Sequence, residues 1–567
     1  MPNNNKSKLS YYFKDAQLRV LLIILFIGFL ARFWGIWNIE QTDEFNEVFE
    51  ALKVDSGRLN LDRWNKKVLV YILAVEYGSY FCFGWIGGIF SSVSDFASKT
   101  VSDMSALFII GRATSAFFGT AIILMTYKIA SLLFSRRVGL VASLFICFNV
   151  VHVEHSHLVL VDITMCLAVA CSFFFLTKLS YWGGKKSYFL AGLFAGLAIV
   201  AKIPSVFILI SLITGHVMFC YRGGKKMGEI GCHSNFILLL GGIAIGMVVG
   251  SPGILVAPGR YFKYMLSLVG AYEGTGDEIT YFMSGNGYIF YLKSMAKNMG
   301  LPIFICLVSS IFLLFVRNDR KKIILLLSFP LPFYLFMSNS KWFLADRYLI
   351  PIYPFLSVLA GRVVVGAGEK FERKWLLTAV CVALVVVPGV RISAFEASLA
   401  RENTRLWARE WIEENIAPGC KILIDSGRTI NTYSPPIFPS ADNVREMMLK
   451  VESLEEGTTY DESRIADAKS VDYFKYLLEA LPEVTYDLTS TERGEAVHNY
   501  SYYVEAGFDY IITSDAITWR TKVSAWRNAF PEQAKFYDYL ETLQPIRVFL
   551  PGRFRSGPCI KIYRVTG

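Results

Sequence analysis

The sequence predicts a polytopic α-helical membrane protein of about eleven transmembrane helices, followed by an extracytoplasmic α/β domain. Of its 567 residues, 54% are hydrophobic and only 18% are charged, and the mean hydropathy is +0.41. A soluble core cannot absorb that much apolar surface. The aromatic share of 15% also suits a bilayer, because Trp and Tyr gather at the level of the lipid headgroups. We therefore treat the bilayer as the main solvent of the chain.

The helix count comes from apolar stretches that are long enough, or nearly long enough, to cross a bilayer. They cover residues 18–38, 107–134, 138–153, 162–181, 188–201, 204–221, 236–256, 298–316, 322–338, 348–366 and 375–393. A further stretch at 68–90 is apolar and aromatic. We expect it to form an interfacial or re-entrant helix pair instead of crossing, because a crossing there would disturb the alternation of basic loops.

The orientation follows from those loops. Lys and Arg cluster at 136–137, 185–186, 222–226, 317–322 and 370–374, and also in the N-terminal 19 residues. Basic loops stay in the cytoplasm, and these loops all fall on one side of an eleven-helix arrangement. The opposite side then receives residues 39–106, residues 257–297 and everything after about 394. Catalytic groups that work at the outer surface must come from these pieces and from the helix ends that face them.

The chain divides by composition into two predicted domains. Residues 1–397 form the membrane domain, in which 39–106 is the first outer loop with juxtamembrane helices. Residues 398–567 form the extracytoplasmic α/β domain, with strands expected at 421–425, 510–513, 547–550 and 560–563 and helices at 405–415 and 473–481. The net charge of +10 does not indicate nucleic acid, since the excess lies in the short membrane loops. We expect membrane lipid as a partner and no nucleic acid.

Three carboxyl groups are candidates for catalysis. Asp43 and Glu44 follow the first helix directly, where one could serve as a base and the other could orient it. A solvated loop is the simpler interpretation of this pair. Asp162 enters the fourth span, and an ionisable group at the mouth of an apolar helix is costly unless it is paired or functional. Snorkelling to the interface is the alternative for Asp162.

Three cations interrupt apolar sequence on the predicted outer side. Lys202 lies between the fifth and sixth spans, and Lys341 and Arg347 precede the tenth. Cations placed there, away from the cytoplasmic loops, are what a lipid-linked phosphate or diphosphate needs. Each one alone could instead be snorkelling to the interface.

A histidine-rich stretch precedes Asp162. Glu154, His155 and His157 at this spacing could hold a divalent metal. They match no familiar ligand signature, so ordinary polar packing is the alternative. No P-loop, dinucleotide fingerprint, nucleophile elbow or zinc-protease motif occurs in a plausible context, which leaves nucleotide-driven chemistry without support.

In this order, the residues resemble the membrane-embedded GT-C glycosyltransferases, in particular the group of protein O-mannosyltransferases and the aminoarabinose transferase of lipid A (glycosyltransferase family 39-like). The likeness runs from the first helix to about residue 400. It depends on an ordered set of short motifs, each of them loose alone. They are Asp43-Glu44, Gly111-Arg112, Asp162, the run from Gly192 to Ala198 with Lys202, and the run from Arg347 to Pro354.

This resemblance implies a donor made of a sugar on a polyprenyl phosphate, and transfer to a protein, lipid or glycan acceptor at the outer face. Asp43 becomes the expected general base, with Glu44 and Asp162 as supporting acidic groups. Lys202, Arg347 and Lys341 become the expected phosphate-binding residues. No cofactor is required, and a divalent metal stays an alternative. Transfer with inversion at C1 is expected, because the phosphate leaves as the deprotonated acceptor attacks.

The sequence departs from two relatives of this fold class. It lacks the Trp-Trp-Asp and Asp-x-Asp motifs expected in an oligosaccharyltransferase, and it lacks the β-trefoil insertion of the eukaryotic protein mannosyltransferases. The modest loops favour a bacterial inner (plasma) membrane, with the C-terminal domain periplasmic or extracellular. A polytopic transporter or flippase for a lipid-linked sugar is the competing hypothesis. It would place polar residues in the middle of several spans, whereas the ionisable groups here cluster at the outer ends.

Overall fold

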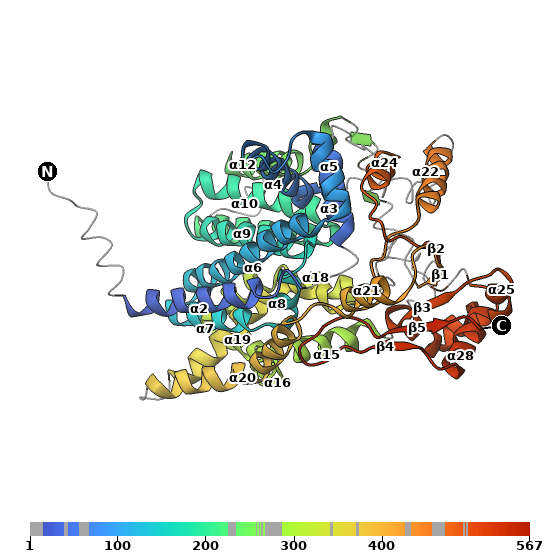
Figure 1. Ribbon diagram of the computed structural model, residues 1–567. Coiled ribbons are helices and arrows are strands. Elements are labelled where there is room, and N and C mark those ends of the chain that lie inside the picture. Colours follow the sequence, from blue (N-terminus) through green and yellow to red (C-terminus); the bar gives the residue numbers. More distant parts are fainter. Residues whose placement is uncertain are drawn as a thin grey trace. The chain divides into compact units, whose positions relative to one another are not determined.

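The computed structural model describes residues 15–38, 44–55, 67–224, 234–256, 258–259, 261, 263, 265–266, 286–340, 344–369, 374–425, 433–455, 471–491, 494 and 497–566. The chain is organised as two compact units (Figure 1). The first unit comprises residues 1–34, 59–72 and 112–395, and the second comprises residues 35–58, 73–111 and 396–567. The domain boundary expected at residue 397 stays a prediction, since each unit draws on several stretches of sequence.

Helices make up the described part of the first unit, and a few of them continue into residues of the second. Their bounds are α2 (Ala16–Phe33), α4 (Lys67–Ile86), α6 (Ser105–Leu133), α7 (Arg136–Cys147), α8 (Val150–Ser156), α9 (Val161–Trp182), α10 (Lys185–Ala201), η1 (Ile203–Phe207), α11 (Ile208–Arg222), α12 (Ser234–Gly250), η3 (Pro252–Leu255), α15 (Gly287–Met299), α16 (Leu301–Ser309), η4 (Ser310–Phe315), α17 (Arg317–Leu327), α18 (Pro330–Asn339), η5 (Asp346–Ile352), α19 (Tyr353–Gly368) and α20 (Lys374–Ser398).

The mostly helical membrane architecture is confirmed, but the exact number of spans is not. Among the described residues, seven helices are long and apolar enough to cross a bilayer, or up to ten when three bent helix pairs each count as one span. The stretch at 68–90 was expected to form a helix pair. Instead, α4 is one continuous helix and a candidate span, because nothing breaks it before Gly87 and Gly88, where φ reaches +74°.

Arg32 supports the bend between α7 and α8, which are inclined by 64°. A broken helix leaves carbonyl groups without their intrahelical partners, and in a membrane these cannot turn to water. The buried Arg32 guanidinium donates to the carbonyl oxygens of Ile146, at 3.1 Å, and Cys147, at 3.4 Å. Its Nη2 also lies 3.1 Å from Nδ1 of His152. Arg32 therefore fixes the point from which α8 starts.

Helices α9, α10 and α12 lie side by side within the first unit (Figure 1). The close approach of α10 to α12 depends on glycines of both helices. A Cβ on Gly196 of α10 would meet the Ile243 carbonyl oxygen at 2.2 Å, and a Cβ on Gly242 of α12 would meet the Phe189 carbonyl oxygen at 2.3 Å. Small residues allow membrane helices to approach backbone to backbone. This packing fixes the C-terminal end of α10, where Lys202 follows.

Polar contacts join the basic loops at one end of the helices. Arg136 Nη1 lies 3.0 Å from Asp15, and Arg362 Nη2 lies 2.9 Å from Asp319. Arg362 also stacks near Phe134, just before α7. Asp162 lies at the N-terminal end of α9, and this helix of 22 residues is about 33 Å long. The pairs Arg136–Asp15 and Arg362–Asp319 join segments that the loop pattern assigns to one side of the membrane, and this assignment stays a prediction.

The second unit contains a five-stranded mixed sheet of order β2-β1-β3-β5-β4 (Figure 1). Its strands are β1 (Lys421–Ile424), β2 (Asp487–Ser490), β3 (Tyr510–Ser514), β4 (Arg547–Phe549) and β5 (Ile560–Arg564), of which β1, β2 and β3 are parallel. Its helices are α3 (Glu44–Asp55), α5 (Val93–Ser102), α21 (Thr404–Asn415), α22 (Ala441–Glu455), α24 (Val471–Glu479), α25 (Tyr500–Glu505), α26 (Asp515–Thr518), η6 (Trp519–Lys522), α27 (Ser524–Ala529) and α28 (Pro531–Thr542). The four strands and two helices expected in this region all form.

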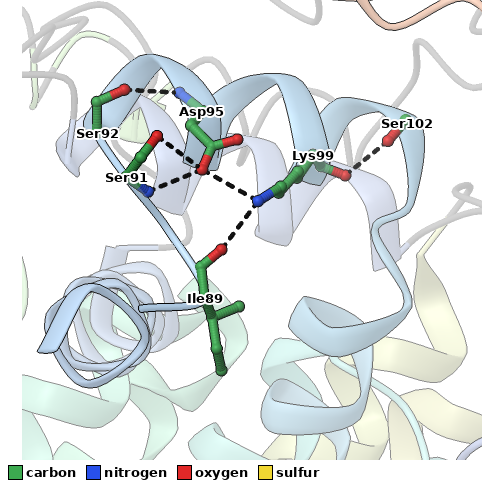
Figure 2. Close-up of polar contacts among 6 residues, drawn as sticks. All are labelled: Ile89, Ser91, Ser92, Asp95, Lys99 and Ser102. Carbon is green, nitrogen blue, oxygen red and sulfur yellow. Dashed lines mark hydrogen bonds and ion pairs between the residues drawn. The ribbon is translucent and has the colours of Figure 1, made fainter. Parts of the chain in front are cut away.

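Helix α5 shows how local sequence fixes an element of this unit (Figure 2). Ser92 caps the helix by accepting a hydrogen bond from the Asp95 backbone N–H at 3.1 Å. Asp95 accepts in turn from the backbone and hydroxyl of Ser91, and Lys99 approaches it at 3.0 Å. The Ser91 backbone and Lys99 hold the pKa of Asp95 below its ordinary value. Lys99 also donates to the Ile89 carbonyl oxygen, which ties the α4–α5 turn to the helix.

Candidate functional site

An ion pair between Asp162 and Lys202 forms the centre of the candidate site. Lys202 Nζ donates to Asp162 Oδ1 at 2.7 Å, and the Asp162 side chain is almost fully buried. Taking two charges out of water is costly unless they compensate one another, so the pair explains why both are tolerated at the mouth of apolar helices. The structure thus brings together a predicted acidic group and a predicted cation that lie forty residues apart.

Local sequence aims the two side chains at one another. Asp162 is in the first turn of α9, where the helix dipole stabilises a negative charge. Lys202 caps the C-terminal end of α10 in an extended conformation, with φ −160° and ψ 128°, where the dipole favours a cation. Pro204, in the first turn of η1, prevents α10 from continuing. Both ends of the pair therefore carry the charge that their helix terminus prefers.

Tyr348 gathers two of the predicted cations. Its ring centroid lies 4.6 Å from Lys202 Nζ and 5.6 Å from the guanidinium carbon of Arg347. These distances are within the range of cation–π attraction. The short helix η5 carries Arg347 and Tyr348 side by side, so the buried tyrosine holds Lys202 and Arg347 near one another.

A small pocket of about 10 Å³, room for about one water molecule, lies beside this cluster. It is lined by Met165, Lys202, Pro204, Phe333, Met337 and Tyr348. The lining combines one ammonium group with apolar and aromatic side chains, which is the chemistry that a phosphate on a hydrocarbon chain requires, although the pocket as described is too small to hold one. Because Lys202 has three N–H donors and gives one to Asp162, it retains donors for a phosphate oxygen.

His155 faces the same charged cluster. It is half-buried on α8, and its nearest charged groups are Asp162, Arg347 and Lys202. Its Nδ1 lies 3.1 Å from the Val151 carbonyl oxygen, so this nitrogen carries the proton and Nε2 is an acceptor when the ring is neutral. His155 thus belongs with the predicted catalytic and phosphate-binding residues.

Glu154 and His157 lie in a different environment. Glu154 interacts electrostatically with Lys297 and Asp346, which form an ion pair of 2.9 Å. Both ring nitrogens of His157 approach carbonyl oxygens, at 2.9 Å from Val153 and 2.9 Å from Trp34. Within the described residues, no three His, Cys, Asp or Glu side chains gather as a metal site. The contacts of His157 are those of polar packing.

Asp43, Glu44 and Lys341 complete the predicted site residues. Asp43 and Lys341 lie outside the described residues. Glu44 begins α3 and is fully buried, but it belongs to the second unit. The expected cooperation of Asp43 and Glu44 with Asp162 therefore stays a prediction.

Sequence reasoning assigned no role to Tyr348 or to the Lys297–Asp346 pair. Tyr348 stands next to Arg347 in a run of apolar residues, and an aromatic residue beside an interfacial cation was the available signal. Lys297 and Asp346 are 49 residues apart. Nothing in either local sequence indicates the other residue.

Comparison with known proteins identifies the fold. Residues 104–267 match the model of the family described as dolichyl-phosphate-mannose-protein mannosyltransferase. No match is found among curated protein sequences. Among solved structures, ArnT from Cupriavidus metallidurans bound to undecaprenyl phosphate is 10% identical with a TM-score of 0.51, covering 96% of this chain and 97% of that one.

A second solved structure is similar over nearly the same length. The Archaeoglobus fulgidus oligosaccharyltransferase, tethered with an acceptor peptide containing the NVT sequon, is 12% identical with a TM-score of 0.51. The match covers 93% of this chain and 72% of that chain. At such identities the likeness concerns the fold alone. It is the GT-C fold, and the matched residues 104–267 contain both Asp162 and Lys202.

Proposed function

We propose that this chain, which has the GT-C fold and is related to the protein O-mannosyltransferase and ArnT group, is a membrane glycosyltransferase. It moves a sugar from a polyprenyl-phosphate donor to a protein, lipid or glycan acceptor at the outer face of a bacterial plasma membrane. The observation that carries this proposal is the cluster of Lys202, Arg347 and Tyr348 around Asp162, beside a pocket with apolar walls. The undecaprenyl phosphate bound to ArnT supports the same class of donor.

The cluster suits the leaving group of such a transfer. When the bond between the sugar C1 and the phosphate oxygen breaks, negative charge grows on the phosphate, and cations placed beforehand stabilise it. Lys202 and Arg347 supply these charges, and the ring of Tyr348 keeps them together. The apolar side chains of Met165, Phe333 and Met337 contact the first part of the polyprenyl chain.

The acceptor side of the reaction needs a base. We assign this role to Asp43, with Glu44 orienting it. The acceptor oxygen forms its bond to C1 from the face opposite the phosphate, its proton passes to the Asp43 carboxylate, and the configuration at C1 inverts. Asp162 is held ionised in place by Lys202, so it can orient the sugar or the acceptor through hydrogen bonds. No nucleotide and no cofactor takes part in this scheme.

Binding of undecaprenyl phosphate to the purified full-length protein tests the proposal, with undecaprenol as the matched ligand without phosphate. We expect the wild type to prefer the phosphate by at least about tenfold, since a charge-assisted contact contributes about 1.5–3 kcal/mol. Lys202→Met and Arg347→Met should each remove most of that preference. Lys178→Met is the control, because Lys178 also contacts an aromatic ring, that of Phe174, but lies at the other end of α9.

A second measurement separates the enzyme from a flippase. Membranes supplied with a polyprenyl-phosphate sugar should form a glycosylated acceptor with the wild type and none with Asp43→Asn, which removes the base with little change in volume. A wild type that moves the lipid-linked sugar across the bilayer without forming product would overturn the transferase.

A further inference from the structure

The hairpin formed by β4 and β5 exposes apolar side chains at the edge of the sheet. Successive residues of a strand point to opposite faces. Phe549 points inward, where its ring packs on Trp407 and Trp411 of α21. Ile546 and Leu550 point the other way and are 47% and 62% exposed, and Phe554 at the hairpin tip is 48% exposed. An exposed apolar stripe of this kind marks a surface that contacts something.

Two arginines lie near this stripe: Arg553 precedes Phe554, and Arg547 lies on the face of the edge strand β4 that also carries Phe549. Arg547 and Arg553 are exposed and stack on Phe549 and Phe554, and they form no ion pair with any residue in the described part of the chain. Arg555 lies over Trp407 at 4.3 Å, and the nearby carboxylates are those of Glu402 and Glu410. The uncompensated positive charge is therefore that of Arg547 and Arg553.

The basic character is local. Residues 542–567 contain five Lys and Arg and no Asp or Glu, whereas residues 401–541 contain 15 Lys and Arg and 25 Asp and Glu. An otherwise acidic domain thus ends in a stretch with a net positive charge. Exposed apolar and cationic side chains close together on an edge strand and its loop suit an anionic lipid surface, through both burial and charge.

Chain connectivity limits how far this hairpin can lie from a bilayer. Helix α20 is a candidate membrane span that ends at Ser398. Arg401 follows three residues later and pairs with Arg555 of the hairpin, and the Thr404 backbone N–H donates to Ser556 at 2.9 Å. Three residues extend over at most roughly 11 Å. The hairpin base is therefore held within a short distance of the end of a span.

We propose that residues 546–555 form a docking element for anionic phospholipid headgroups. Leu550 and Phe554 enter the interfacial layer, and Arg547 and Arg553 contact lipid phosphates. The charge complementarity and the connection to α20 favour a lipid surface over an extended peptide that would pair with the β4 edge. The inference does not depend on the proposed glycosyltransferase activity.

Photocrosslinking of the full-length protein tests this element. The photoreactive residue benzoylphenylalanine replaces Phe554, and the protein is placed in nanodiscs of phosphatidylglycerol or of phosphatidylcholine. We expect lipid adducts by mass spectrometry, at least threefold more with phosphatidylglycerol. The same probe at Tyr539, an aromatic residue of this unit that is 46% exposed, is the control and should give few adducts. Adding Arg547→Gln and Arg553→Gln to the Phe554 probe should remove the preference for phosphatidylglycerol.

Three results would overturn the proposal. Adducts of the Phe554 probe with protein instead of lipid would assign the stripe to this chain itself or to a protein partner. Equal lipid adducts from the probes at Phe554 and Tyr539 would show no specific docking. Equal adducts in the two lipids would show that Arg547 and Arg553 contribute no headgroup recognition.

Discussion

Lys202 reaches Asp162 across 2.7 Å, from the C-terminal end of one helix to the N-terminal end of another. The pair places a carboxylate and an ammonium where a substrate phosphate would add a second negative charge. Arg347, which lies 5.6 Å from the centre of the Tyr348 ring, supplies the additional positive charge. Lys202 and Arg347 together therefore balance Asp162 and one further negative charge of a group that binds there.

Removing one member of this pair should cost more stability than removing both. Lys202→Met leaves the Asp162 carboxylate buried without its partner, and breaking a buried pair typically costs about 3–5 kcal/mol. The double variant Asp162→Asn, Lys202→Met removes both charges and should recover much of that loss. Thermal unfolding, followed by intrinsic fluorescence, measures the purified wild type and the two variants. A double variant no more stable than Lys202→Met alone would contradict the ion pair.

Much of the membrane architecture could be predicted because its signals are local. A run of apolar residues reports its own helix, and basic loops report one side of the bilayer. The exact spans were less accessible. Helices α10 and α12 have 17 residues each, and the bends at α7–α8 and α15–α16 depend on contacts that hydropathy does not contain. The continuous α4 was missed because the alternation of basic loops argued against a crossing at 68–90.

The site shows the same limit. Asp162, Lys202 and Arg347 could be named because charges stand out within apolar sequence, and their direct proximity now rests on contacts within one unit. This proximity holds whether or not α4 crosses the membrane. The ring of Tyr348 between two cations could not be inferred, since tertiary packing alone brings η5 to the end of α10.

Two adjacent glycines in α12 should differ sharply in their tolerance of alanine. A Cβ on Gly242 would meet the Phe189 carbonyl oxygen at 2.3 Å, so Gly242→Ala must push α10 and α12 apart. Overpacking of this kind costs about 1–3 kcal/mol. Gly241→Ala is the matched control, because a Cβ there has nothing within 4 Å. Thermal unfolding of both variants should show a loss for Gly242→Ala only, and equal stability of the two would contradict the close packing.

Arg32 should be needed for the α7–α8 bend. Arg32→Met keeps the length of the side chain but leaves the Ile146 and Cys147 carbonyl oxygens without their donor, at about 1–3 kcal/mol for each unsatisfied group. We expect a lower unfolding temperature and faster hydrogen exchange in residues 146–157. Arg19→Met, at the other end of α2, is the control. Unchanged exchange in this segment would show that the bend does not depend on Arg32.

The stability of the second unit should fall as pH rises from about 4 to about 6, because the buried Asp425 carboxyl loses its proton in the folded chain. Burial raises the pKa of this carboxyl to about 6, although hydrogen bonds from Tyr537, the Ser514 backbone and Thr491 lower it. Between the unfolded pKa of about 3.9 and the folded value, the folded chain binds the proton and the unfolded chain does not. The stabilisation is therefore complete below that window and is lost as pH rises through the folded pKa.

Hydrogen exchange of the β1 and β3 peptides in the full-length protein measures this effect. Asp425→Asn cannot titrate, so the ratio of exchange rates between wild type and variant cancels the intrinsic dependence of exchange on pH. Two pKa units correspond to about 3 kcal/mol, and we expect the wild type to lose protection relative to the variant by up to that amount between pH 4 and pH 7. Parallel profiles for the two proteins would show that Asp425 is ionised throughout, with its three hydrogen bonds outweighing its burial.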